Sequence, residues 1–423
     1  MLDVKIIRDQ PEIIKAMLAK RHIEFPFDEL QDFDKKRRAL ITEAQELKHK
    51  RNVVSEHIAA KKKSGEDAST AINEMKLIAD RIGALDAEIE HAEKRYQELM
   101  LMLPNLIHES VPEGKDENDN VEVRRWGEPR KFGFKAKDHI ELGTSLDLID
   151  LDRAAKVSGA RFYFLKGDLV KMNHALIQLA LDFLRKKNYT LIQTPYMINR
   201  KAMEGAVMLS DFGDVIYKIE DDDLYMIGTS EHAMVAMHME EIFDVKQLPI
   251  RYAGVSPCFR KEAGAHGKDT KGIFRVHQFE KVEQLIFANP ENSWSEHEKM
   301  IQNAEEFFKL LGIPYKIVLL CTADLGKISA KTYDLEAWMP GQNAYREVVS
   351  CSNCLDYQAR RLGVKYRDKP NEESKFVHTL NSTLVATERT LVAILENYQT
   401  EKGTVIVPEV LRPYMDGISE ISS

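Results

Sequence analysis

Two apolar heptad series near the start of the chain constrain its fold more than any other feature. The first runs from Leu30 to Ile58 and the second from Met75 to Leu103, with members at alternating steps of three and four residues. Seven of the nine members are apolar in the first series and all nine in the second, which places one apolar stripe along each helix. Because the stretch KKKSGEDAST between them is short and contains Gly65, we expect the helices to reverse and pair as an antiparallel coiled coil.

Charge is distributed unevenly over these two helices. Residues 34–63 hold ten Lys or Arg against four Asp or Glu, whereas residues 66–98 hold four against nine. The net charge of −8 argues against a polyanionic partner, but the local distribution decides where such a partner binds. A coiled coil commonly serves as a spacer or an oligomerisation element, and that interpretation stays open. The basic first helix favours phosphate contacts instead, from Lys48, Lys50, Arg51, Lys61, Lys62 and Lys63.

The rest of the chain has the pattern of an α+β domain. An N-terminal domain over 1–107 is followed by a Pro-, Gly- and acid-rich segment, 108–134, which we expect to be a linker, and by a body over 135–423. Neither GxGxxG nor GxxxxGK[ST] occurs, which weighs against a Rossmann-type fold. Strand-like segments without regular βαβ alternation favour a largely antiparallel sheet flanked by helices: 224–227, 250–259, 273–288, 315–321, 333–338, 346–350 and 376–380.

The 25 residues 259–283, FRKEAGAHGKDTKGIFRVHQFEKVE, carry the most informative chemistry. Their glycine-rich middle predicts the loop of a long hairpin between two strands. Charged residues that alternate on a strand are usually a solvated face, but Phe279 among them argues against this, because its ring would then face water. Since alternate residues of a strand share a face, we expect two sets: Arg275, Phe279 and Glu283, and Arg260 with Glu262.

This hairpin resembles motif 2 of class II aminoacyl-tRNA synthetases and in detail is similar to that of the seryl-tRNA synthetase family, a likeness that extends over nearly the whole chain. The resemblance implies that Arg260 contacts the α-phosphate of ATP and the amino acid, and that Glu262 accepts from the adenine amino group. It also implies that Phe279 stacks on adenine and that Arg275 holds the polyphosphate. A guanidinium suits the role of Arg260, because its planar fork can bridge a carboxylate and a phosphate.

A helix over 168–187, a strand over 189–194 and Pro195 are similar to motif 1 of the family, which is a dimer interface. Taken alone, Pro195 would mark only the end of a strand. The resemblance therefore implies a homodimer that forms near Pro195.

The segment NSTLVATERTLVAILENYQ resembles motif 3, although Ser382 and Ala386 are among the residues that replace its usual glycines. We expect a helix over 383–398. An ER dipeptide on a helix is in general a surface ion pair. The resemblance instead implies that Arg389 binds the γ-phosphate, and that Arg260 and Arg389 are the catalytic residues.

Magnesium prefers hard oxygen ligands beside phosphates, and Glu347 with Ser350 in REVVSCSNC resembles the metal pair of the family. Three residues apart on a regular strand, these side chains would face opposite ways, so we expect a bulge or a strand end near Val349. The same segment contains Cys351 and Cys354. Because no second pair follows at finger-like spacing, we expect buried thiols and no zinc.

Selection of serine requires partners for an ammonium, a carboxylate and a hydroxyl. Thr229 and Ser230 could equally be helix N-caps, and the two roles are compatible. His266 and His277 are not expected to act as a general base, since the carboxylate of the substrate is already ionised at neutral pH. The resemblance assigns the serine contacts to Thr229, Glu231, Arg260, Glu283, Asn381 and Thr383.

Together these features predict an ATP- and Mg²⁺-dependent ligase that forms seryl-adenylate and then charges the 3′ end of tRNA(Ser); charging of tRNA(Sec) stays open. One rival is a class II relative that activates another small amino acid or loads a carrier protein, and the basic arm argues against the carrier. Another is an inactive RNA-binding paralogue, against which the complete set of charged site residues argues. The four cysteines, the absence of an apolar run of about 18 residues and the acidic N-terminus predict a cytoplasmic protein without a membrane contact.

Overall fold

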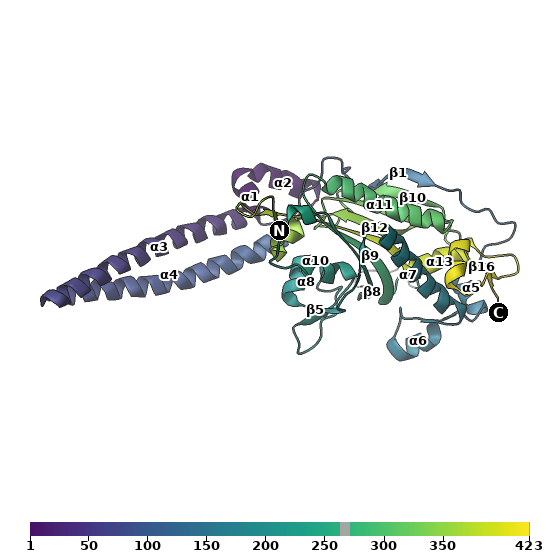
Figure 1. The fold of residues 1–423 in the computed structure, drawn as a ribbon, viewed down its shortest axis with the longest axis horizontal. Coiled ribbons are helices and arrows are strands. Elements are labelled where there is room, and N and C mark those ends of the chain that lie inside the picture. Colours follow the sequence, from purple (N-terminus) through teal and green to yellow (C-terminus); the bar gives the residue numbers. More distant parts are fainter. Residues whose placement is uncertain (263–270, 423) are drawn as a thin grey trace. The chain divides into compact units, whose positions relative to one another are not determined.

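The computed structural model describes residues 1–262 and 271–422 and forms two compact units, Leu2–Pro104 and a larger one over Asn105–Ser423 (Figure 1). His266 and most of the expected hairpin loop lie outside the described residues. Among the described residues, no helix is both long and apolar enough to span a bilayer.

The smaller unit is dominated by a helical hairpin. Helix α3 ends at Gly65, whose φ of 75° is a left-handed conformation that glycine adopts without strain. Residues 40–44 of α3 pack with 85–92 of α4, and Val54 packs with 71–82. Later residues of α3 therefore meet earlier residues of α4, which confirms the antiparallel coiled coil. The four helices are α1 Val4–Asp9, α2 Pro11–Lys20, α3 Phe27–Ser64 and α4 Ser69–Met102.

The larger unit is built on one eight-stranded sheet. Its strands are antiparallel to their neighbours except for β4, which runs parallel to β8. This arrangement confirms the predicted α+β class. In spatial order the strands are β1 Val121–Trp126, β10 Tyr315–Leu319, β11 Lys331–Met339, β12 Ala344–Asn353, β15 His378–Ala386, β9 Gln278–Ala288, β8 Ile250–Phe259 and β4 Thr190–Gln193.

Strand β9 lies between β15 and β8, and its two faces have different surroundings. Val282 and Ile286 point into the main core, and Gln284 donates to the carbonyl of Met300 in α11 at 3.2 Å. Because successive residues alternate, Phe279 and Glu283 face the other side of the sheet. Helices pack against the face of β9 that carries Val282 and Ile286. The polar residues on the opposite face, which carries Phe279 and Glu283, are thus free to line a site.

Helices surround this sheet (Figure 1). Cores form on both of its faces: the main one includes α7, α11 and α13, and a smaller one joins α8 and α10 to the end of β9. The helices are α5 His139–Ser145, α6 Leu151–Ser158, α7 Asp168–Lys186, α8 Arg200–Ala206, α9 Leu209–Phe212, α10 Ser230–Ala236, α11 Ser293–Leu310, α12 Tyr357–Leu362 and α13 Thr387–Asn397. Short strands complete the unit: β2 Ile149–Asp150, β3 Phe164–Leu165, β5 Met197–Asn199, β6 Leu224–Met226, β7 Ile242–Asp244, β13 Lys365–Arg367, β14 Lys375–Phe376, β16 Val405–Ile406 and β17 Glu420–Ile421.

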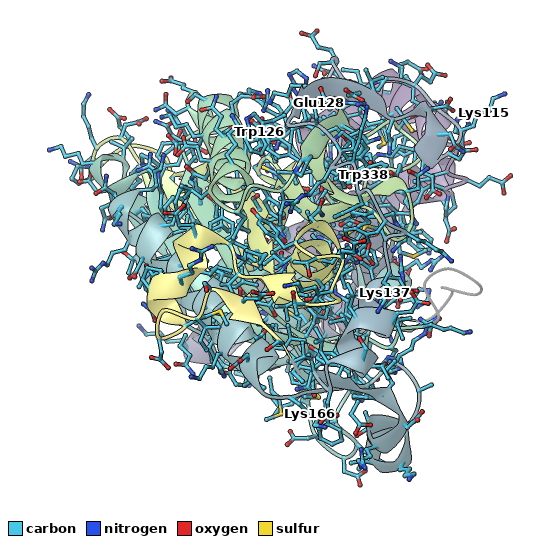
Figure 2. All side chains as sticks on the ribbon, turned by 90° about the vertical axis from the view of Figure 1, so that its right-hand side faces the viewer. Lys115, Trp126, Glu128, Lys137, Lys166 and Trp338 are labelled. Carbon is cyan, nitrogen blue, oxygen red and sulfur yellow. The ribbon has the colours of Figure 1, made fainter. Side chains whose placement is uncertain are left out.

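The segment 108–134, expected to be a linker, instead belongs to the larger unit. It contains β1, which pairs with β10 at the edge of the sheet. Trp126 of β1 stacks on Tyr315 with ring centroids 5.9 Å apart. Figure 2 labels Trp126 among the side chains of the structure. Pro, Gly and acidic residues lie on both sides of β1. Because they dominate the composition of the segment, the sequence did not predict this edge strand.

Candidate active site

A cavity of about 270 Å³ lies over the β9 face that carries Phe279 and Glu283. Because β9 is central in the sheet, residues from β12, β15, α10, α13 and the end of β8 reach the same space. Arg260, Phe279 and Glu283 therefore lie together in one cavity. Ten predicted site residues line it: Thr229, Glu231, Arg260, Phe279, Glu283, Glu347, Ser350, Asn381, Thr383 and Arg389.

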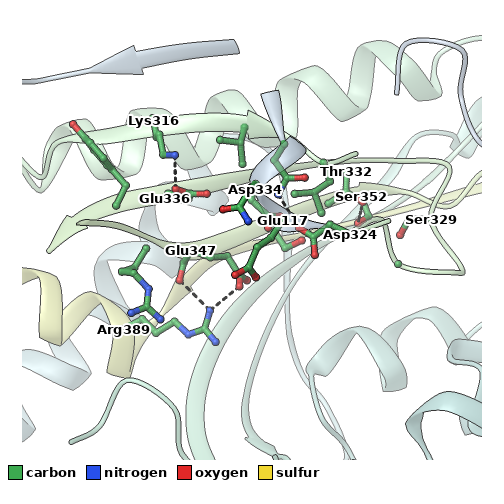
Figure 3. A pocket seen from close by; sticks show the side chains of 18 of the residues that line it. Glu117, Lys316, Asp324, Ser329, Thr332, Asp334, Glu336, Glu347, Ser352 and Arg389 are labelled. Carbon is green, nitrogen blue, oxygen red and sulfur yellow. Dashed lines mark hydrogen bonds and ion pairs between the residues drawn. The ribbon is translucent and has the colours of Figure 1, made fainter. Parts of the chain in front are cut away.

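A larger cavity of about 950 Å³ shares Glu347, Ser350 and Arg389 with the first (Figure 3). Arg275 lines this second cavity. Glu262 lines neither cavity, but its Oε2 lies 3.0 Å from the guanidinium of Arg275. The two predicted residues that lie outside the first cavity are thus paired beside it.

Glu231 forms an acidic anchor at one end of the first cavity. Its Oε1 accepts hydrogen bonds from Gln358 at 2.9 Å and from Asn381 at 3.2 Å. Burial and the neighbouring Glu283 raise the pKa of Glu231 to about 7. The hydroxyl of Thr229 accepts from the backbone N–H of Glu231 at 3.2 Å, so Thr229 is the N-cap of α10. A buried carboxylate held in this way suits a cationic group such as an ammonium.

Glu283 forms a second anchor, and only 1% of its surface is exposed. Its Oε2 accepts from the hydroxyl of Thr383 at 3.2 Å and is ion-paired with Lys281. Both contacts fall on one oxygen, which leaves Oε1 as the atom that a ligand hydroxyl would reach. A small ligand with an ammonium and a hydroxyl therefore matches the two acidic anchors.

Cations and an aromatic ring line the same cavity. The guanidinium carbon of Arg260 lies 5.3 Å from the ring centroid of Phe279, and that of Arg389 lies 5.1 Å from Phe274. Arg389 also pairs with Glu347 at 3.2 Å (Figure 3). The positive charges of Arg389 and Arg260 lower the pKa of Glu347, whose side chain is 48% exposed. These groups can hold a planar base and a polyanion.

The oxygens expected to hold magnesium lie on β12. The pairing of β12 with β11 shifts register between Val349 and Glu347, so Val348 forms a bulge. This confirms the irregularity expected near Val349 and explains how Glu347 and Ser350 line the same two cavities. The nearby Asp334 is buried, and its Oδ1 has no hydrogen-bond partner among the described residues. Among these residues, no group of three or more His, Cys, Asp or Glu side chains could hold a metal ion.

Comparison with known proteins decides the family. Residues 217–398 match the model of the class II tRNA synthetase core domain (G, H, P, S and T), and residues 1–107 match that of the seryl-tRNA synthetase N-terminal domain. The chain is 59% identical over 421 residues to the serine--tRNA ligase of Nitrosopumilus maritimus, with full coverage of both chains. The chain belongs to the seryl-tRNA synthetase family.

Solved structures agree with this assignment. The seryl-tRNA synthetase of Pyrococcus horikoshii, solved with ATP, matches 100% of this chain and 99% of its own at 49% identity and a TM-score of 0.94. The cytoplasmic serine-tRNA ligase of Naegleria fowleri, solved with AMP, matches at 39% identity and a TM-score of 0.88, with 100% and 99% of the chains covered. A prolyl-tRNA synthetase of Giardia lamblia shares the fold alone, at 16% identity and a TM-score of 0.56 over 65% of this chain.

The motif 2 hairpin of this synthetase differs from the expected one. Strand β8 ends at Phe259 and β9 begins at Gln278, so Arg260, Glu262 and Arg275 are not strand residues. The alternation argument holds only for Phe279 and Glu283. The backbone N–H of Arg260 instead donates to the carbonyl of His277 at 2.9 Å, and Nδ1 of His277 faces the carbonyl of Arg260. His277 thus closes the base of the hairpin.

The motif 3 segment of this synthetase also differs. Asn381 and Thr383 lie on β15, and α13 begins only at Thr387, so the expected helical start at Thr383 is wrong. The helical periodicity and the polar, cap-like residues of this segment predicted a helix where the structure has a strand. In the ladder of that strand with β9, Asn381 pairs with Leu285 and Thr383 pairs with Glu283. This pairing, rather than a helix start, brings Thr383 to Glu283. Cys351 and Cys354 are buried free thiols, as expected.

The six basic residues expected to bind tRNA do not share one environment. Lys48 pairs with Asp86 at 3.1 Å and Lys50 pairs with Glu74 at 2.8 Å, so both also hold the two helices of the hairpin together. Arg51, though on the expected apolar seam, is exposed. Lys61, Lys62 and Lys63 lie in the last turn of α3, where no ion pair is found for them within the described chain. These three lysines and the exposed Arg51, for which no ion pair is found among the described residues either, are the most available of the six to a phosphate.

Several residues at the site of this synthetase were missed in the sequence. Gln358 and Asp334 gave no local signal. Lys281 lies between Phe279 and Glu283 in the period-2 pattern of β9, so the alternation argument could have found it. Glu388 also lines the first cavity, and burial raises its pKa to about 7.

Proposed function

We propose that the chain activates L-serine with ATP to form seryl-adenylate and pyrophosphate, and then transfers the seryl group to the 3′-terminal adenosine of tRNA(Ser). The observation that carries the proposal is the first cavity. It combines an acid for an ammonium, an acid for a hydroxyl, and two arginines with an aromatic ring for a nucleotide. Membership of the seryl-tRNA synthetase family supports the same conclusion.

In the first step, a carboxylate oxygen of serine attacks the α-phosphorus of ATP, and the bond to pyrophosphate breaks as the new P–O bond forms. Positioning and charge stabilisation account for most of such a phosphoryl transfer. Arg260 would align the carboxylate with the α-phosphate, because its guanidinium lines the cavity of the two acidic anchors and lies 5.3 Å from the centroid of the Phe279 ring. Arg389 would exchange its contact with Glu347 for the γ-phosphate, and Arg275 would neutralise the remaining polyphosphate charge.

Magnesium fits the residues of β12. Glu347 and Ser350 present hard oxygens toward both cavities, and Mg²⁺ commonly uses one or two protein oxygens together with phosphate and water. When bound, the ion would neutralise phosphate charge. The Oδ1 atom of Asp334, which has no hydrogen-bond partner among the described residues, supports this assignment, because it could accept from a further donor or a cation.

In the second step, a terminal ribose hydroxyl of the tRNA attacks the carbonyl carbon of the adenylate, and AMP leaves. The proton of the hydroxyl would pass to the substrate or to water, because His277 is held by the Arg260 carbonyl. The role of the N-terminal domain is to bind tRNA, with the lysines at the end of α3 contacting phosphates of its backbone.

The chain would act as a homodimer through α7, β4 and Pro195. Strand β4 is an edge of the sheet, and its exposed apolar side chains suit an interface: Leu191 is 40% exposed and Met197, just beyond the strand, is 46% exposed. All four cysteines are free thiols, which suits the reducing cytoplasm that we propose as its compartment.

Pyrophosphate exchange measured with serine, threonine, alanine and glycine tests the proposal. We expect exchange with serine and at least 10⁴-fold weaker exchange with alanine, because alanine would leave the polar groups around Glu283 unpaired. Exchange with none of these amino acids would support the inactive paralogue. Preference for another amino acid would support the other class II relative.

A further inference from the structure

Lys281 is a buried cation that has no part in the mechanism described above. It lies on β9 between Phe279 and Glu283 on the same face of the strand, and only 6% of its surface is exposed. Its ammonium pairs with Oε2 of Glu283 and lines the first cavity. The aliphatic part of the side chain is enclosed by the neighbouring strands, since Lys281 is paired with Ser256 on β8 and with Ala386 on β15.

A lysine in the interior of a sheet requires an explanation, because an apolar residue would fill the same space without desolvating a charge. Lys281 has one ion-pair partner in the described structure, Glu283. Glu283 in turn receives only the neutral hydroxyl of Thr383 in addition to that ammonium. The two charges therefore depend on each other.

The balance of charge around the cavity indicates a function for the pair of Lys281 and Glu283. Four carboxylates line it, Glu231, Glu283, Glu347 and Glu388, against the cations Arg260, Lys281 and Arg389. Arg389 pairs with Glu347 and also approaches Glu388, and the ammonium of serine would bind Glu231. Lys281 is then the counter-charge left for Glu283.

We propose that Lys281 is a specificity-determining positioning residue, which holds Oε2 of Glu283 and so orients Oε1 to accept a hydrogen bond from the hydroxyl of serine. This inference rests on the proposed function. A substrate without a hydroxyl would leave the buried Oε1 of Glu283 without a hydrogen-bond donor, which lowers its affinity. The ammonium also occupies Oε2, which directs Oε1 toward the substrate.

The test uses two non-hydrolysable adenylate analogues, seryl- and alanyl-sulfamoyl adenosine, whose Kd values are measured by calorimetry on the full chain. Lys281→Met removes the charge and keeps the length of the side chain. We expect it to weaken seryl-analogue binding 10- to 100-fold and alanyl-analogue binding less than threefold. Lys281→Arg keeps the charge and should restore part of the preference. A loss of affinity that is equal for the two analogues would overturn the inference, since it indicates general damage to the cavity.

Two further variants control the experiment. Lys299→Met removes a lysine that pairs with Glu296 at 2.9 Å on α11, away from the cavity, and should change neither Kd.

If Lys281→Met does not fold, the double variant with Glu283→Gln removes both buried charges and is the fallback. We expect the double variant to discriminate as poorly as Glu283→Gln alone, and a further loss of discrimination would contradict the inference. If the unsubstituted chain itself binds both analogues equally, the proposed function fails, whereas an unchanged preference in Lys281→Met removes only the role of Lys281.

Discussion

Replacing Glu231 with glutamine should stabilise the protein and weaken its activation of serine. Burial, together with Glu283, raises the pKa of Glu231 from 4.5 to about 7. At about 1.36 kcal/mol per pKa unit, holding this carboxylate ionised destabilises the folded state by roughly 3 kcal/mol. Glutamine is neutral at every pH and retains an oxygen for the hydrogen bonds from Gln358 and Asn381.

The sign of the pH dependence follows from the direction of the shift. Between pH 4.5 and about 7 the folded state binds a proton at Glu231 that the unfolded state has released, so wild-type stability falls as the pH rises through this window. The advantage of Glu231→Gln should therefore be about 3 kcal/mol at pH 8 and below about 1 kcal/mol at pH 5. Urea unfolding followed by tryptophan fluorescence measures this in the larger unit, because all three tryptophans, Trp126, Trp294 and Trp338, belong to it.

The same variant should lose serine activation. An ionised partner for an ammonium contributes roughly 1.5–3 kcal/mol, so serine kcat/KM in pyrophosphate exchange should fall about 10- to 150-fold while the ATP KM changes little. In the wild type, serine kcat/KM should be about tenfold lower at pH 6 than at pH 8, since a group with a pKa of about 7 is then mostly protonated. Glu220→Gln, at an exposed position, is the matched control. A Glu231→Gln protein that is less stable at pH 8, or that keeps the wild-type pH profile of serine activation, would refute the reasoning.

Three further predictions concern the nucleotide, the tRNA and the dimer. Phe279→Leu should raise the ATP KM about tenfold, because base–aromatic stacking contributes ~1–3 kcal/mol; an unchanged KM in exchange assays would show that the base binds elsewhere. Changing Lys61, Lys62 and Lys63 together to Glu should lower aminoacylation kcat/KM at least about tenfold and spare adenylate formation, because phosphate contacts contribute to affinity without taking part in adenylation; equal loss of both steps would contradict a tRNA-binding role. Leu191→Lys should convert a dimer to monomers in light scattering, because it places a charge in an apolar interface, and an unchanged mass would place the interface elsewhere.

Much of the site could be predicted because its chemistry is concentrated in short segments. Phe279 and Glu283 lie four residues apart on a regular strand, so strand periodicity alone places them on one face. The irregularity of β12 was also predictable, since Glu347 and Ser350 could reach one site only through a bulge. By contrast, the strand residue Thr383 was assigned to a helix, because the ladder between β15 and β9 is a long-range contact that local propensity does not report.

The sequence alone determined the elements whose signal is local and periodic: the antiparallel helical hairpin, the α+β class, and the residue types of motifs 2 and 3. Only the tertiary structure decided how distant groups combine. It inserted β15 between β12 and β9, made a sheet edge of the expected linker, and placed the Lys281 ammonium against Glu283 within reach of Glu231. The physical reason is that side-chain periodicity is encoded residue by residue, whereas burial, counter-charge and pKa depend on neighbours that meet only when the sheet is assembled.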